Sequence, residues 1–218
     1  MTQMPGARPS HILFCAAFFL ALGGCSPDYQ PTLPGDRKDE KAVPSGEAAA
    51  AIFAGGCFWC TESDFEKVPG VITAVSGYTG GTLANPSYEQ VSAGGTGHYE
   101  AVRVTYDPVR VTYPELVAYY FRTVDPTDPG GQFCDRGASY RTAIFVADEE
   151  ERGIAESEKE EVMRELRRPV ATMILPVTRF YPAENYHQDY YKKNSLKYRF
   201  YRTRCGRDAR LSEVWGRR

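Results

Sequence analysis

Residues 51–60, AIFAGGCFWC, give the clearest indication of how the chain folds. Its first four residues are apolar and two glycines follow, a pattern typical of a buried strand that ends in a tight turn. After this turn we expect a helix that begins at Cys57 and runs to about Lys67. The stretch therefore predicts a strand–turn–helix unit that carries Cys57 and Cys60 in the first turn of its helix.

A cysteine at a helix N-terminus lies beside free backbone N–H groups and the positive end of the helix dipole. Both stabilise a thiolate, so we expect the pKa of Cys57 to be lowered. The CxxC pair has three interpretations: a redox dithiol, half of a zinc site, or two small buried side chains. A zinc site needs a second cysteine pair, and Cys134 and Cys205 lie far apart in the sequence. We therefore expect no metal.

Outward from this unit, strand and helix patterns alternate irregularly and long loops separate them. This order predicts an α+β domain, an α/β sandwich with a mixed sheet and flanking helices. For the basic segment 192–218 we favour a solvated face or attraction to anionic lipid over a tail that binds nucleic acid. The expected strands are 71–78, 99–106, 142–146 and 170–177, and the expected helices are 113–124, 148–167 and 187–196.

The composition of the 218-residue chain is that of a globular protein, with 42% hydrophobic and 25% charged residues. This excludes wholesale disorder and a membrane protein with several spans. The 26 basic and 28 acidic residues give a net charge of −2, so no global positive field attracts nucleic acid. Six cysteines are too few for a disulfide scaffold.

The N-terminus has the pattern of a targeting segment. Arg8 precedes an apolar run that ends in residues 22–25, LGGC, which resemble the lipobox of bacterial lipoproteins. This resemblance implies a signal peptide over 1–24, lipidation of Cys25, and a place in the cell envelope on the extracytoplasmic side of a bacterial membrane, facing the periplasm in a Gram-negative cell. The alternative is an ordinary signal peptide. Residues 25–50 are expected to form a flexible tether, and residues 51–218 the catalytic domain.

Six blocks of the sequence resemble the peptide methionine sulfoxide reductase A family. The first is its signature, residues 56–59, GCFW. The others follow in family order: 76–81, SGYTGG; 85–88, NPSY; 97–102, GHYEAV; 135–141, DRGASYR; and 186–188, YHQ. The resemblance covers about residues 51–196 and implies a ferredoxin-like core, with no metal and no bound organic cofactor.

The resemblance implies a catalytic set for reduction of a sulfoxide. Cys57 attacks the sulfoxide sulfur, and Glu100, held neutral by burial, protonates its oxygen. Tyr88 and Tyr140 donate hydrogen bonds to the same oxygen. The attack leaves a sulfenic acid on Cys57, which a second thiol converts to a disulfide.

The resemblance also implies the substrate and the residues that bind it. The substrate is the S epimer of methionine sulfoxide, free or in oxidised proteins and peptides. Phe58 and Trp59 form an apolar wall for its methyl group, and Asp135 binds its backbone. Each of these residues alone has an ordinary structural interpretation, and it is the joint pattern that favours the functional one.

The second thiol has three candidates. Many family members carry glycine where this chain has Cys60, and in members with cysteine there it acts as the recycling thiol. We favour Cys60 over Cys205, whose neighbouring arginines would stabilise a thiolate, and Cys205 over Cys134. A relay through two of them is also open. The resulting disulfide is reduced by thioredoxin or an envelope thiol carrier.

Two other functional classes remain open from the residues. One is a thiol–disulfide oxidoreductase built on the CxxC pair, which would not need Glu100. The other is a lipid-anchored binding module with structural cysteines, which predicts no reactive thiol at Cys57. For the reductase we expect a monomer that binds no nucleic acid.

Overall fold

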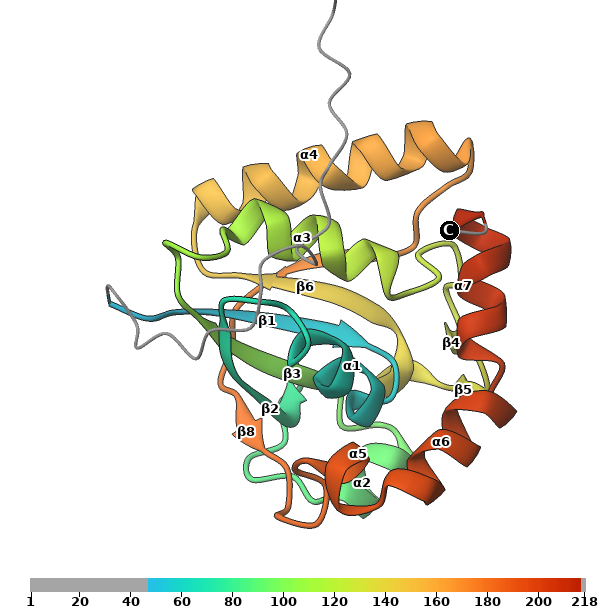
Figure 1. Cartoon of the computed structure of the whole chain (residues 1–218). Coiled ribbons are helices and arrows are strands. Elements are labelled where there is room, and N and C mark those ends of the chain that lie inside the picture. The colour runs from blue at the N-terminus through green and yellow to red at the C-terminus, as the bar shows by residue number, and fades with distance from the viewer. Residues whose placement is uncertain (1–46, 217–218) are drawn as a thin grey trace, which may run out of the picture. The chain divides into compact units, whose positions relative to one another are not determined.

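A six-stranded sheet lies at the centre of the computed structural model, which describes residues 47–216 (Figure 1). Its strand order is β7–β6–β1–β3–β2–β8, and all neighbours are antiparallel except the parallel pair β6 and β7. The predicted mixed sheet is confirmed. The strands are β1 (Ala49–Gly55), β2 (Val71–Thr79), β3 (Tyr99–Tyr106), β6 (Thr142–Val146), β7 (Met173–Pro176) and β8 (Tyr181–Pro182).

The centre of the sheet has ferredoxin-like topology, as expected. The elements β1, α1 (Phe58–Phe65), β2, β3, α3 (Tyr113–Arg122) and β6 follow one another as a βαββαβ unit. In space these four strands lie in the order β6–β1–β3–β2. Strands β7 and β8 extend the sheet at its two edges.

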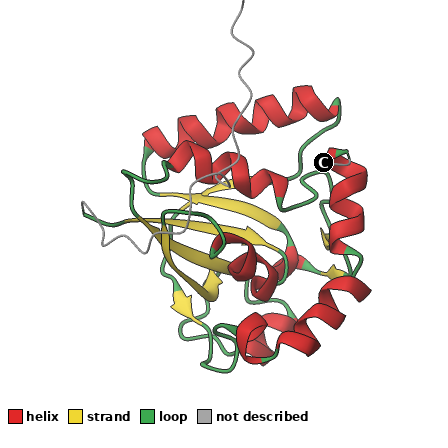
Figure 2. Ribbon diagram, in the orientation of Figure 1, coloured by secondary structure: helices red, strands yellow, loops and turns green. Residues whose placement is uncertain are grey.

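The main hydrophobic core lies between one face of the sheet and the helices α1, α3 and α4 (Glu149–Leu166) (Figure 2). Phe53 of β1 stacks on Phe65 of α1 and on Tyr120 of α3, with ring centroids 4.8 and 5.2 Å apart. A smaller apolar cluster, which includes Ala101 and Phe145, covers the other face. Helix α1 is thus packed firmly on the sheet, and its first turn is held in place.

The helix starts follow their capping residues. Thr112 and Glu115 form a capping box at the start of α3, and Asp148 accepts a hydrogen bond from the Glu151 N–H at the start of α4. Shorter elements lie in the loops around the sheet. These are α2 (Tyr88–Ala93), β4 (Gly131–Gln132), β5 (Asp135–Arg136) and a 3₁₀ turn (Ala138–Tyr140).

The C-terminal region differs from the prediction. Instead of one helix over 187–196, the structure has three, α5 (Tyr190–Lys193), α6 (Ser195–Arg204) and α7 (Arg207–Trp215). The expected solvated basic face is also wrong in part, because Arg207 is only 2% exposed. Its guanidinium donates hydrogen bonds to the carbonyls of Gly55 and Thr123, at 3.2 and 2.7 Å.

Within residues 47–216, no helix combines the length and the apolar character needed to cross a membrane. The proposed signal peptide, Cys25 and the tether up to residue 46 lie outside the described residues.

Candidate active site

A small pocket opens at the N-terminus of helix α1. Seven of the eight residues that line it are those the sequence singled out, and the eighth is Tyr201 of α6. The pocket thus brings together residues from α1, α2, β3, the segment 135–140 and α6. Its lining residues are Cys57, Phe58, Trp59, Tyr88, Glu100, Asp135, Tyr140 and Tyr201.

The turn between β1 and α1 presents Cys57 to this pocket. Gly56 has a φ of +81°, and a Cβ atom there would lie 2.5 Å from Cβ of Gln132, so only glycine fits. Cys57 caps α1, and its carbonyl accepts the Cys60 and Thr61 N–H groups at 3.1 and 3.3 Å. Both thiols are free and buried, with Cys57 6% and Cys60 2% exposed.

Glu100 lies on β3 directly beside the nucleophile candidate. The Phe58 N–H donates a hydrogen bond to Glu100 Oε2 at 3.1 Å. Burial raises the pKa of Glu100 to about 8, and the Asp135 carboxylate adds to this effect. The carboxyl group is therefore mostly protonated at neutral pH, which is the state expected of a proton donor.

The pKa values of the two cysteines differ from the prediction. Burial raises the pKa of Cys57 well above its ordinary value, and negative charge on Cys60 and Glu100 raises it further. A hydrogen bond from Cys57 lowers the pKa of Cys60 to about 7, with help from the positive charge of Arg207. The expectation of a lowered pKa at Cys57 is wrong because the thiol is buried, and the neighbouring Cys60 and Glu100 also disfavour its thiolate.

Two tyrosine hydroxyls face the carboxyl group of Glu100. Tyr88 and Tyr140 line the pocket together with Glu100. Burial raises the pKa of both tyrosines, so both hydroxyls stay protonated. Together with Glu100, they surround one point of the pocket with hydrogen-bond donors.

The apolar wall of the pocket is formed by Phe58, which is 1% exposed, and by the half-buried Trp59. The Trp59 ring stacks on Tyr190 with centroids 3.7 Å apart. Its indole N–H donates to Nδ1 of the buried His187 at 3.0 Å. His187, for which no catalytic role was expected, therefore fixes the orientation of the Trp59 ring.

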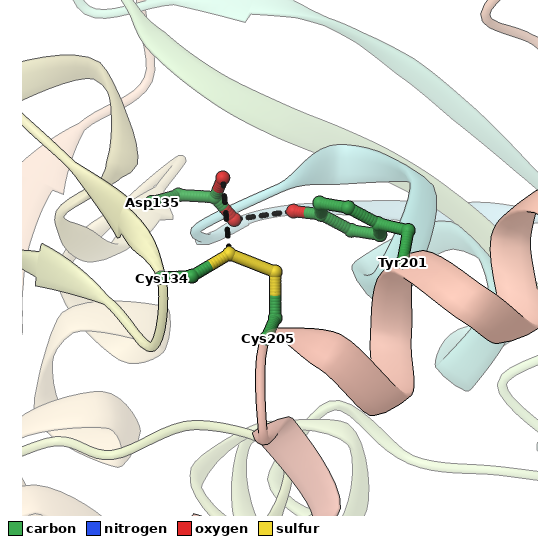
Figure 3. The surroundings of a disulfide bond; sticks show 4 residues. All are labelled: Cys134, Asp135, Tyr201 and Cys205. Atoms are coloured by element: carbon green, nitrogen blue, oxygen red, sulfur yellow. Dashed lines mark hydrogen bonds between the residues drawn. A yellow bond between two sulfur atoms is a disulfide. The ribbon is translucent and has the colours of Figure 1, made fainter.

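Asp135 and Tyr201 close the pocket on the side of the C-terminal helices. The Tyr201 hydroxyl donates a hydrogen bond to Asp135 Oδ2 (Figure 3). Burial raises the pKa of Asp135, which the hydrogen bond from Tyr201 opposes. The sequence missed Tyr201 because it lies on a helix that was not predicted.

Cys134 and Cys205 are joined by a disulfide bond, although 71 residues separate them in the chain (Figure 3). Because the two cysteines lie far apart in the sequence, their pairing was not predicted. Cys205 is thus bonded away from Cys57 in this state. The arginines expected to stabilise its thiolate, Arg202 and Arg207, lower the pKa of Cys60 instead.

Comparison with known proteins decides the family. Residues 49–218 match the peptide methionine sulfoxide reductase family. The chain belongs to this family. The protein named peptide methionine sulfoxide reductase MsrA 2 of Caulobacter vibrioides is 55% identical over 176 residues, 80% of this chain and 89% of that protein. Its namesake in Rhizobium meliloti is 52% identical over 174 residues, 80% and 87% of the two chains.

Solved structures agree with this assignment and with the α+β fold. The reduced form of Mxr1 from Saccharomyces cerevisiae has a TM-score of 0.66 and 32% identity, covering 72% of this chain and 91% of that one. Methionine sulfoxide reductase A of Corynebacterium diphtheriae has a TM-score of 0.63 and 33% identity, covering 71% and 79%. The protein is a methionine sulfoxide reductase, an oxidoreductase.

The described part of the reductase has two groups of three side chains that could hold a metal ion, because their ligand atoms lie within 4.8 Å of one another. Cys134, Asp135 and Cys205 form one, but its sulfurs are joined to each other and are not thiolates. The other consists of Glu62, Glu66 and Asp189. The charge of Glu66 is already paired with Lys192.

Proposed function

We propose that the pocket reduces the S epimer of methionine sulfoxide, free or within oxidised proteins, through nucleophilic attack by Cys57 on sulfur. The observation that carries this proposal is the buried Glu100, a carboxyl group with a pKa of about 8 that is hydrogen-bonded to the residue next to Cys57. A thiol and a neutral acid facing the same small pocket match what sulfoxide reduction requires.

In the proposed step, the sulfoxide oxygen lies among Glu100, Tyr88 and Tyr140, and the Cys57 thiolate attacks sulfur. Glu100 gives its proton to the oxygen, which is transferred to the cysteine sulfur as the S–O bond of the substrate breaks. The products are methionine and a sulfenic acid on Cys57. The substrate sulfur gains two electrons and Cys57 loses two.

Cys60 has two tasks in this proposal. Its pKa of about 7 keeps Cys60 partly ionised at neutral pH, so that its thiolate can take the Cys57 proton as Cys57 attacks. After the attack, the Cys60 thiol condenses with the sulfenic acid to a Cys57–Cys60 disulfide and water. Cys60 is favoured over Cys205 because it lies within the same helical turn and is free.

The electrons that restore the thiols come from an external dithiol, thioredoxin or an envelope thiol carrier. This dithiol attacks the Cys57–Cys60 disulfide and is itself oxidised to a disulfide. No bound organic cofactor takes part in these steps.

For localisation, we propose that Cys25 is lipidated and that the reductase is tethered to the extracytoplasmic side of a bacterial membrane. The support is the apolar run followed by residues 22–25, LGGC. Mass spectrometry of the full chain from membranes should find a lipid adduct on Cys25, and Cys25→Ala should release the protein. An unmodified N-terminus at Cys25 would overturn this proposal.

The test of the catalytic proposal uses the full chain, dithiothreitol and a peptide with racemic methionine sulfoxide, with both epimers followed by chiral chromatography. We expect only the S epimer to disappear, Cys57→Ser to be inactive, and Glu100→Gln to lose at least about a hundredfold in rate. The matched control is Glu160→Gln, an exposed glutamate on α4. Full sulfoxide turnover by Glu100→Gln would refute the acid role of Glu100 and would favour the alternative function, a thiol–disulfide oxidoreductase.

A further inference from the structure

Tyr201 is the pocket residue that no part of the proposed chemistry uses. It reaches the pocket from α6, near the C-terminus, and its ring meets Trp59 edge-on with centroids 5.7 Å apart. Its hydroxyl donates a hydrogen bond to Asp135 Oδ2. Burial keeps this hydroxyl protonated, so it remains a donor.

A covalent bond fixes this contact. Cys134 directly precedes Asp135, and Cys205 lies one helical turn after Tyr201, whose carbonyl accepts the Cys205 N–H at 2.9 Å. The Cys134–Cys205 disulfide therefore joins the two backbones beside the two residues that are hydrogen-bonded (Figure 3). The Cα atoms of Cys134 and Cys205 lie 4.8 Å apart, so the disulfide holds α6 against the β4–β5 hairpin.

We infer that Tyr201 is a positioning residue that holds the Asp135 carboxylate in its substrate-binding orientation, and that the Cys134–Cys205 disulfide places Tyr201 there. The inference rests on the proposed role of Asp135 in binding the substrate backbone. A hydrogen bond to Oδ2 restricts rotation of the carboxylate and leaves Oδ1 for the substrate. Loss of the hydroxyl therefore weakens binding and leaves the chemical step intact.

The expected effect falls on affinity. A hydrogen bond to a charged group contributes enough that its loss changes an equilibrium by about tenfold. We expect Tyr201→Phe to raise the half-saturating concentration of the first turnover about tenfold, with the limiting rate within about twofold of wild type. Phenylalanine keeps the ring against Trp59, so the packing of α6 is retained.

The experiment measures the first turnover of the full chain on a methionine sulfoxide peptide, with enzyme in excess and no added reductant. Rapid quenching and chromatography give the rate across enzyme concentrations. Peptide mapping verifies that Cys57 and Cys60 are free in each preparation, and that the Cys134–Cys205 bond is intact in every variant that retains both cysteines. Tyr113→Phe is the matched control, because it removes a buried hydroxyl that has no partner among the described residues.

Asp135→Asn and the double variant separate the inference from the proposal beneath it. If Tyr201 acts through Asp135, adding Tyr201→Phe to Asp135→Asn changes nothing further. A wild-type half-saturating concentration in Tyr201→Phe, or additive effects in the double variant, would overturn the inference. If Asp135→Asn itself binds substrate normally, the proposed role of Asp135 fails instead.

Cys134→Ser tests the role of the disulfide in the same assay, in which recycling plays no part. We expect it to raise the half-saturating concentration as Tyr201→Phe does, with no further rise when both changes are combined. Wild-type binding by Cys134→Ser would show that the rest of α6 places Tyr201 without the disulfide, and would overturn that half of the inference.

Discussion

Replacing Glu100 by glutamine should make the reductase more stable while it destroys catalysis. Burial raises the pKa of Glu100 from 4.5 to about 8, so the folded protein holds a proton that the unfolded chain loses at neutral pH. The folded state therefore binds more protons than the unfolded state between these two pKa values. Stability from this group consequently falls as the pH rises through that window.

The size of the effect follows from the pKa difference. At pH 7, which lies between the two pKa values, keeping the carboxyl group neutral costs roughly 3 kcal/mol. At pH 5 the same cost is below about 1 kcal/mol. Glutamine carries no such cost, and its amide oxygen can still accept the Phe58 N–H. Glu100→Gln should therefore exceed wild type in its free energy of unfolding, and we expect this difference to be about 2 kcal/mol larger at pH 7 than at pH 5.

The assay is urea unfolding of both proteins at pH 5, 6 and 7, with Glu160→Gln as the control for a change at an exposed glutamate. The titrations of the other groups are common to both proteins and cancel in the difference. A difference in the free energy of unfolding between Glu100→Gln and wild type that stays constant with pH, or that narrows as the pH rises, would show that the pKa of Glu100 is not raised in the folded protein.

Three further predictions concern the same pocket. The limiting rate of the first turnover should fall tenfold per pH unit above pH 8, as Glu100 ionises, and a rate that stays level to pH 10 would contradict its acid role. Cys60→Ser should form about one methionine per enzyme, more slowly than wild type because Cys57 loses its base, and then stop, as counted by quenched chromatography, whereas continued turnover with thioredoxin would assign recycling to another thiol. Arg207→Met should raise the pKa of Cys60, measured from the pH dependence of its alkylation, and should cost about 3 kcal/mol in urea unfolding because the buried carbonyls of Gly55 and Thr123 lose their hydrogen-bond donor. An unchanged alkylation profile would remove Arg207 from the control of Cys60.

The strand, turn and first helix could be predicted because their signals are local. The apolar run, Gly56 and the CxxC pair lie within ten residues, and the structure places them as β1, a turn with positive φ and α1. The same holds for β3, whose alternation predicted its bounds of Tyr99–Tyr106.

The C-terminal helices could not be predicted in this way because their stabilising partners are distant in the sequence. Arg202 of α6 pairs with Asp64 of α1 at 2.9 Å, and Arg207 of α7 binds backbone carbonyls of the core. From the sequence alone, such arginines indicate a solvated surface. The pairing of Cys134 with Cys205 and the arrival of Tyr201 in the pocket depend on the same unpredicted packing.

The pKa of Cys57 was predicted wrongly for a related reason. Its position at a helix N-terminus was identified correctly, and the rule that such a position stabilises a thiolate is sound. What the sequence did not reveal is that tertiary packing buries the Cys57 thiol and brings Cys60 and Glu100 beside it, and all three effects raise its pKa. A local rule therefore failed where burial outweighed the effect of the helix N-terminus.

The burial of Cys57 and Glu100 has a consequence for which damaged proteins this enzyme repairs. With only 6% and 2% of their surfaces exposed, neither residue can meet a sulfoxide that is packed inside a folded partner. The oxidised side chain must leave its own protein and enter the pocket. Repair is then fastest for oxidised methionines on mobile segments and in partly unfolded chains. The conformational freedom of the damaged protein, more than its sequence, therefore determines how fast each oxidised methionine is reduced.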